Sequence, residues 1–110
     1  MDFIHGNWTD DVINTSTSGD QTIVAASDTS QIFILSMSVI ATGDTDVTIK
    51  LGSREVGFFK LTAGQSINLS GLANHRGAPY FICEVGEDFI LESSAATNLS
   101  GTVKWALNQP

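Results

Sequence analysis

The chain has 110 residues, with 12 acidic and 5 basic side chains that give a formal net charge of −7. A hydrophobic fraction of 42% against a charged fraction of 15% is typical of a globular domain and excludes a disordered chain, and this length accommodates a single core. The basic residues are scattered, so we expect neither nucleic acid nor an anionic membrane as a partner, since both require clustered positive charge.

The first twenty residues differ in composition from the rest. Residues 1–6 include the apolar Phe3 and Ile4, and residues 8–17 are rich in Asn, Asp, Ser and Thr around Val12 and Ile13. We therefore predict an N-terminal arm and edge segment over 1–20, followed by a β-sandwich domain over 21–110. The arm packs either on a neighbouring subunit or across the bottom of its own sandwich. Trp8 is an interface candidate, because aromatic residues often anchor interfaces.

From residue 21 to residue 107 the sequence is a succession of short β-type runs. The run Gln31–Ala41 is apolar on both faces: strict alternation places Phe33 and Met37 on one face and Ile32 and Ile34 on the other. A half-solvated strand would alternate between apolar and polar residues, so the second face is expected to meet another sheet, segment or subunit.

The other runs follow with turn signals between them. A two-residue connection, Gly52-Ser53, predicts a hairpin between Asp46–Leu51 and Arg54–Leu61. The remaining runs are Gln21–Ala26, Ser66–Leu69, Tyr80–Val85, Phe89–Glu92 and Leu99–Leu107. About eight strands at spacings of roughly 8 to 12 residues predict an all-β, single-domain sandwich or barrel without a helix of useful length.

The sequence contains no concentration of catalytic residues, and we predict no enzyme, no cofactor and no metal site. Cys83 lies within an apolar run and is expected to be a small buried side chain. Asp44 and Asp46 could chelate Ca²⁺ only with further oxygen ligands at a spacing that is absent. The acidic residues between 84 and 92 could supply a pair for glycoside hydrolysis, but solvated faces explain them better.

Five short pieces of the sequence stand in a recognisable order. They are Ile40–Gly43, Val47–Gly52, Leu61–Gly64, Pro79–Phe81 and Asn98–Trp105. In this order they resemble a family of small bacteriophage virion proteins, and the resemblance covers residues 21 to 107. It implies a β-sandwich of jelly-roll character without enzymatic activity, which serves as a capsid cement (decoration) protein or as a tail or fibre component.

The resemblance and the composition together predict a structural virion protein. We favour a capsid cement or decoration protein that binds the major capsid protein as a homo-oligomer, either a trimer or a dimer. The alternative is a tail, fibre or baseplate component, with host glycan as a ligand. Because residues 1–5 lack the basic and apolar regions of a signal peptide, synthesis in the bacterial cytoplasm is expected before assembly on the capsid surface.

The interface candidates are few. Besides Phe3, Ile4 and Trp8 of the arm, the long irregular stretch Ser70–Pro79 contains His75 and Arg76, the one locally basic spot. Loops of this kind carry function more often than strands do. These two side chains either contact an acidic capsid surface or cap the loop.

Overall fold

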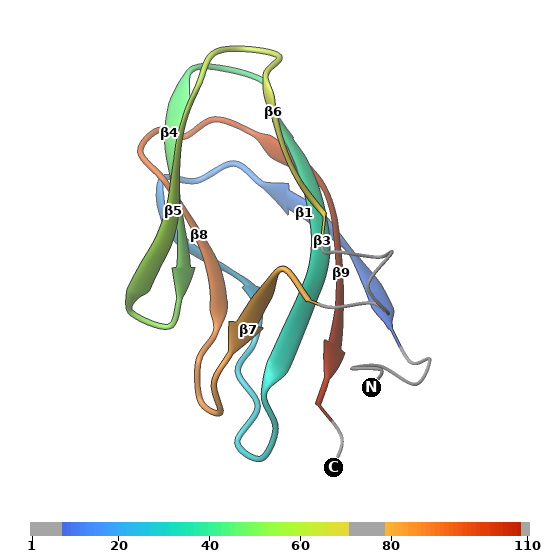
Figure 1. The fold of residues 1–110 in the computed structure, drawn as a ribbon. Helices are drawn as coiled ribbons and strands as arrows, with labels where there is room; N and C mark the ends of the chain where they lie inside the picture. The colour runs from blue at the N-terminus through green and yellow to red at the C-terminus, as the bar shows by residue number, and fades with distance from the viewer. Residues whose placement is uncertain (1–7, 71–78, 109–110) are drawn as a thin grey trace.

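A computed structural model describes residues 8–70 and 79–108 of the chain. These residues form nine β-strands and no helix, arranged in two layers that face each other (Figure 1). The strands are β1 (Thr9–Thr15), β2 (Gly19–Val24), β3 (Ile32–Ala41), β4 (Thr45–Leu51), β5 (Arg54–Leu61), β6 (Ser66–Ser70), β7 (Phe81–Cys83), β8 (Phe89–Ser93) and β9 (Leu99–Leu107). No helix that could cross a membrane is found in these residues.

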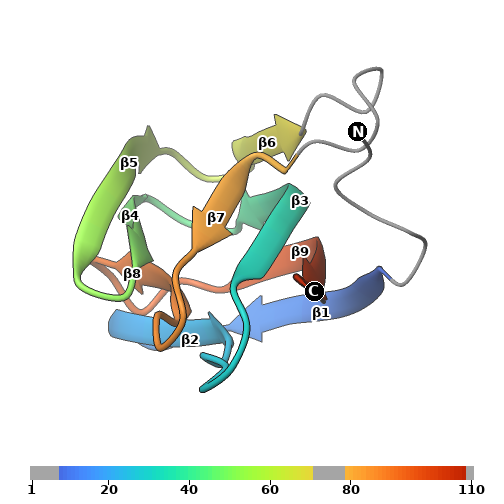
Figure 2. The ribbon, with the colours of Figure 1, turned by 60° about the horizontal axis from the view of Figure 1, so that its bottom comes forward.

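The strand order is that of a jelly roll. Sheet A has the order β1-β9-β3-β6, with β7 also paired to β3, and sheet B has the order β2-β8-β4-β5 (Figure 2). All pairs are antiparallel. β6 pairs with the segment 36–40 of β3 and β7 pairs with the segment 32–34, so the two short strands share one strand position. Eight strand positions in two sheets confirm the predicted all-β sandwich of jelly-roll character.

Strand β3 contains a bulge, so its side chains do not alternate strictly between the two faces of sheet A. Its register with β9 shifts between Ile34 and Ser36, which is the signature of a β-bulge. Ile32 and Ile34 therefore face the same core as Met37 and Val39, and all four are at most 2% exposed. The predicted assignment of Ile32 and Ile34 to the opposite face from Met37 was wrong, because one extra residue reverses the alternation.

The core lies between the two sheets. Val47, Ile49 and Leu51 of β4 alternate inward as predicted and meet side chains of β3, β8 and β9 in one cluster. The predicted β4–β5 hairpin is confirmed, with Gly52 at a positive φ in its turn. Only a residue without a Cβ adopts that conformation at little cost.

Two strands of sheet A approach each other closely at one glycine. A Cβ on Gly101 of β9 would lie 1.8 Å from the carbonyl oxygen of Ser38 on β3. No side chain fits at that distance, so a glycine is required where the inner face of β9 passes the middle of β3. The contact fixes the spacing of the two central strands.

β1 forms an edge of sheet A and pairs with β9 along its whole length. Ile13 is buried, and the indole N–H of Trp105 donates a hydrogen bond of 2.8 Å to Asp11. Residues 9–15 are thus part of the sandwich. β2 begins at Gly19, in sheet B.

Candidate interaction surfaces

The predicted interface residues fall mainly outside the part of the chain that the structure describes. Phe3, Ile4, His75 and Arg76 lie there, and their roles stay predictions. Trp8 is described: it directly precedes β1 and is half-buried.

The outer face of sheet A carries an apolar row. Phe33 of β3 pairs with Ala106 on one side and with Ile82 on the other. Alternation places Phe33 on the outer face, between the inward Ile32 and Ile34, yet it is only 4% exposed. This row could not be predicted from the sequence, because it depends on which residues of β7 and β9 pair with Phe33.

The long irregular stretch is anchored at both of its ends to the same strand. Ser70 closes β6 opposite Ser36, and the backbone N–H of Tyr80 donates to the carbonyl oxygen of Ile34 at 2.7 Å. The two anchor points flank the bulge of β3. His75 and Arg76 stand in the sequence between these ends.

Aromatic side chains continue from the second anchor into the core. The Tyr80 ring meets Phe81 edge-on with 4.8 Å between centroids, and Phe81 lies 6.2 Å from Phe89. Phe89 is fully buried, whereas Tyr80 is exposed. The chain of rings therefore stabilises the end of the loop while leaving one phenol in solvent.

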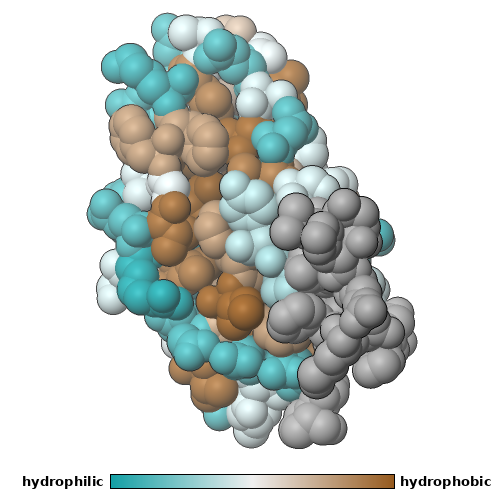
Figure 3. All heavy atoms as spheres, viewed as in Figure 1, coloured by the Kyte–Doolittle hydropathy of each residue, from teal (hydrophilic) through white to brown (hydrophobic). Residues whose placement is uncertain are grey.

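Apolar surface gathers on the side of the sandwich between β5 and the β6–β7 edge (Figure 3). Val56 and Phe58 of β5 are 38% and 64% exposed, and Ile82 of β7 is 38% exposed. Inward-facing side chains that only partly reach the core add to it, namely Phe59, Leu69 and Phe81. Phe58 and Ile82 point to the outer faces of sheets B and A, on opposite sides of this surface, so we call only the three inward-facing residues, Phe59, Leu69 and Phe81, the open flank. Sequence reasoning missed it, although the Phe58-Phe59 pair was a signal, since consecutive strand residues point to opposite faces.

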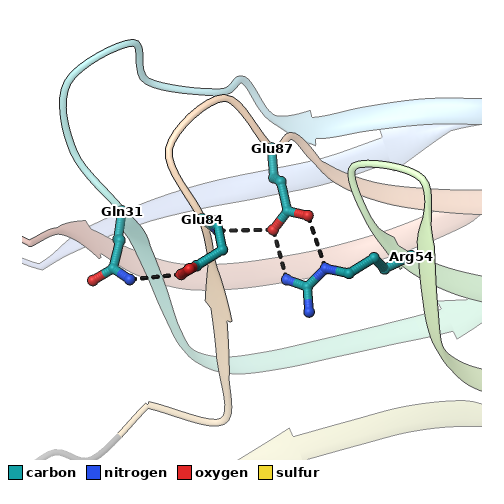
Figure 4. A network of polar contacts seen from close by, with 4 residues as sticks. All are labelled: Gln31, Arg54, Glu84 and Glu87. Carbon is teal, nitrogen blue, oxygen red and sulfur yellow. Dashed lines mark hydrogen bonds and ion pairs between the residues drawn. The ribbon is translucent and has the colours of Figure 1, made fainter.

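A polar network joins three turns at one end of the molecule (Figure 4). Arg54 donates two hydrogen bonds, of 2.8 and 2.6 Å, to the carboxylate of Glu87. That carboxylate also accepts the backbone N–H of Glu84 at 2.8 Å, and the side chain of Glu84 accepts a hydrogen bond from Gln31 at 2.6 Å. The hydrogen bond from Arg54 is the main reason that the pKa of Glu87 lies below its usual range.

The other acidic side chains near this end also have structural partners. Asp88 accepts the backbone N–H of Ala26 at 2.6 Å. Glu92 lies 3.3 Å from the ammonium of Lys50, which also contacts Asp20 at 3.0 Å, and the hydrogen bond to Asp20 raises the pKa of Lys50. Each carboxylate of the segment 84–92 thus stabilises a strand or a turn. In residues 8–70 and 79–108, no three His, Cys, Asp or Glu side chains come together as a metal site requires.

Cys83 is an inert thiol in this fold. Its side chain is fully buried at the end of β7, and burial raises its pKa to about 12. The thiolate is the nucleophilic form, so the side chain acts as a core hydrophobe, as predicted.

No family model matches the chain, and no curated protein or solved structure matches it either. The fold is therefore established by its own strand order. The likeness to phage virion proteins stays a prediction from the order of five sequence pieces.

Proposed function

We propose that this protein is a structural component of a phage particle, a capsid cement or decoration protein that stabilises the head lattice as a homo-oligomer. Its partner is the major capsid protein. Its mechanism is adhesion, in which apolar and hydrogen-bonded contacts bridge capsid subunits. The acidic surface keeps such a protein soluble before assembly. On binding the capsid it buries apolar surface, which stabilises the contact by about 25 cal/mol per Å² of buried area.

The observation that carries the proposal is the meeting of three of the five resembling pieces at one end of the sandwich. The backbone N–H of Gly64 donates to Ala41 at 2.7 Å, and the N–H of Thr42 donates to Asn98 at 3.0 Å. Pieces that are generic when taken one by one therefore build a single structural unit. This supports a resemblance that rests on their order.

The open flank is a second support. It presents apolar side chains on a sandwich whose acidic residues in the segment 84–92 are engaged in structural contacts. An exposed apolar patch of this kind is typical of a protein interaction surface. It suits a protein that works by adhesion.

Quantitative mass spectrometry of purified particles of the encoding phage tests the proposal. We expect a molar ratio to the major capsid protein near one or a simple fraction of one. A ratio of a few per cent would move the protein to the tail, and absence from the particles would overturn the virion proposal.

One observation favours the alternative of a tail or fibre component that binds host glycan. On the outer face of sheet B, a shallow depression is lined by Phe58 together with the polar side chains of Asp46, Thr48, Glu92 and Ser94. An aromatic face beside carboxylates and hydroxyls is chemistry that suits a sugar ring. A glycan array with the wild-type protein and Phe58→Ala tests it: binding that requires Phe58 supports this alternative, and no binding refutes it.

A further inference from the structure

The outer edge of β5 combines an exposed aromatic residue with two charged residues. β5 is the last strand of sheet B, and no described strand pairs with its outer edge (Figures 1 and 2). Phe58, 64% exposed, lies near the middle of this strand. An unpaired edge with an apolar residue is a template for pairing with another chain.

Glu55, Phe58 and Lys60 all lie on the outer face of the sheet. They pair with Lys50, Thr48 and Asp46 of β4, which alternate with the buried residues of that strand. The odd spacing between 55 and 58 is explained by a register shift between Ile49 and Lys50, where β5 carries the extra residue Val56. The bulge thus places a negative charge, an aromatic ring and a positive charge in one line.

Neither of these two charges forms an ion pair within the described residues. Three of the four Lys and Arg side chains there form ion pairs: Lys50 with Asp20 and Glu92, Arg54 with Glu87, and Lys104 with Asp10. The fourth, Lys60, has no ion pair and no side-chain hydrogen bond, and the same holds for Glu55. An unpaired acid and an unpaired base therefore flank the exposed ring.

We propose that two copies of this chain form a dimer through antiparallel pairing of their β5 edges about a two-fold axis at Phe58. Phe58 then lies opposite its counterpart, and aromatic cross-strand pairs stabilise sheets. Two residues further, Lys60 of one copy comes opposite Val56 and Glu55 of the other copy. The two-fold axis forms this opposite-charge contact twice, so the edge is self-complementary.

The charges also select the register. Edge charges generally discourage pairing, because most registers leave a charge opposite an apolar residue or a like charge. The register centred on Phe58 brings opposite charges together. It yields a closed dimer, since a two-fold contact uses both β5 edges and leaves none for a third copy.

The other edges lack this combination. The β1 edge exposes Asp10 and Asp11 directly before Val12, so a two-fold contact there would bring carboxylates together. On the β6 edge the exposed side chains, those of Ser66, Asn68 and Ser70, are polar, and Leu69 is partly buried. Among the described edges, β5 is the one with an aromatic centre and charges of both signs.

The β5 dimer gives the homo-oligomer of the proposed function an interface and a copy number. To this extent the inference rests on the proposed function. Sedimentation velocity of the full chain should show a dimer that dissociates on dilution. Glu55→Lys and Lys60→Glu should each weaken dimerisation by roughly tenfold, because each change puts two like-charge pairs into the interface. The double variant E55K/K60E should restore it. A wild-type monomer at high micromolar concentration, a trimer, or a double variant no better than the singles would overturn the proposal.

Cysteine cross-linking locates the axis. Because Cys83 is buried, Phe58→Cys provides one accessible thiol, and directly opposed strand residues lie within disulfide range. We expect F58C to oxidise rapidly to a linked dimer and Val12→Cys, on the exposed β1 edge, to do so only slowly. Faster linking of V12C would overturn the β5 interface.

Particle composition is a separate readout. Stoichiometric incorporation of a monomer would refute the dimer alone, whereas a solution dimer that is absent from particles would refute the virion role alone.

Discussion

Arg54 and Glu87 form a two-pronged ion pair that joins the β4–β5 hairpin to the turn before β8, across 33 residues of sequence. Guanidinium and carboxylate are matched in shape, so the pair restricts the relative orientation of two turns as well as their distance. Glu84 and Gln31 extend the contact toward the start of β3. This end of the sandwich is therefore held together by side chains from three separate turns.

The pair makes stability depend on pH in a defined direction. Because the pKa of Glu87 is lowered in the folded protein, its contribution is fully present above the ordinary glutamate pKa, about 4.3, and is lost as the pH falls through the lower folded value. Glu87→Gln should therefore lower the melting temperature at pH 7, and the difference from wild type should shrink below about pH 4. Thermal melts from pH 7 to pH 3 measure this. Asp28→Asn, at an exposed carboxylate, is the control, and a wild-type advantage that grows at low pH would contradict the assignment.

Gly101 should tolerate no side chain. Gly101→Ala places a methyl group on the Ser38 carbonyl, so β9 and β3 must separate, at a cost of more than about 4 kcal/mol in unfolding free energy. Gly43→Ala is the matched control: its Cβ would meet the movable Thr97 side chain at 3.2 Å, and we expect a change within about 1 kcal/mol. Urea unfolding followed by circular dichroism compares the two. Equal stability of G101A and G43A would show that the central strands adjust.

A buried pair of hydroxyl groups between β4 and β8 should stabilise the folded protein. The hydroxyls of Thr45 and Ser93 are 2.7 Å apart, and Thr45 also accepts the backbone N–H of Ala95 at 3.3 Å. Thr45→Val leaves that donor without its partner and should cost about 1–3 kcal/mol. Thr48→Val, on the outer face of the same strand, should change stability by about 0.5 kcal/mol or less. Similar values for the two variants in denaturant titrations would contradict the role of the pair.

Cys83 should resist modification while the protein is folded. With a pKa of about 12, roughly one thiol in ten thousand is ionised at pH 8, and the side chain is fully buried. Iodoacetamide should label the wild-type protein only after unfolding in guanidinium. The thiol of V12C, at a position that is 79% exposed on the β1 edge, should react within minutes under the same native conditions. Rapid native labelling at Cys83 would mean that β7 opens readily.

The sequence predicted most strands well, because period-two alternation and glycine turns are local signals. Arg54–Leu61 and Leu99–Leu107 coincide with β5 and β9. The phase of β3 was not predictable, since a bulge at Leu35 depends on how β9 pairs with it. The open flank was missed for a related reason: the partial exposure of the inward-facing Phe59 follows from β5 being an edge strand, which is a property of the sheet order. The arm and loop candidates were chosen by composition, and most of them lie outside the described residues.

The shared strand position of β6 and β7 has a consequence for protein engineering. Ser70 and Tyr80 are both bound to neighbouring residues of β3, so the strand itself holds the two ends of the intervening segment close together. Loop-closure entropy grows only slowly with length, so a foreign peptide grafted between these anchors should cost little folding free energy. The position is therefore suited to displaying an epitope, and in the proposed cement role such a graft would be repeated many times over the particle surface.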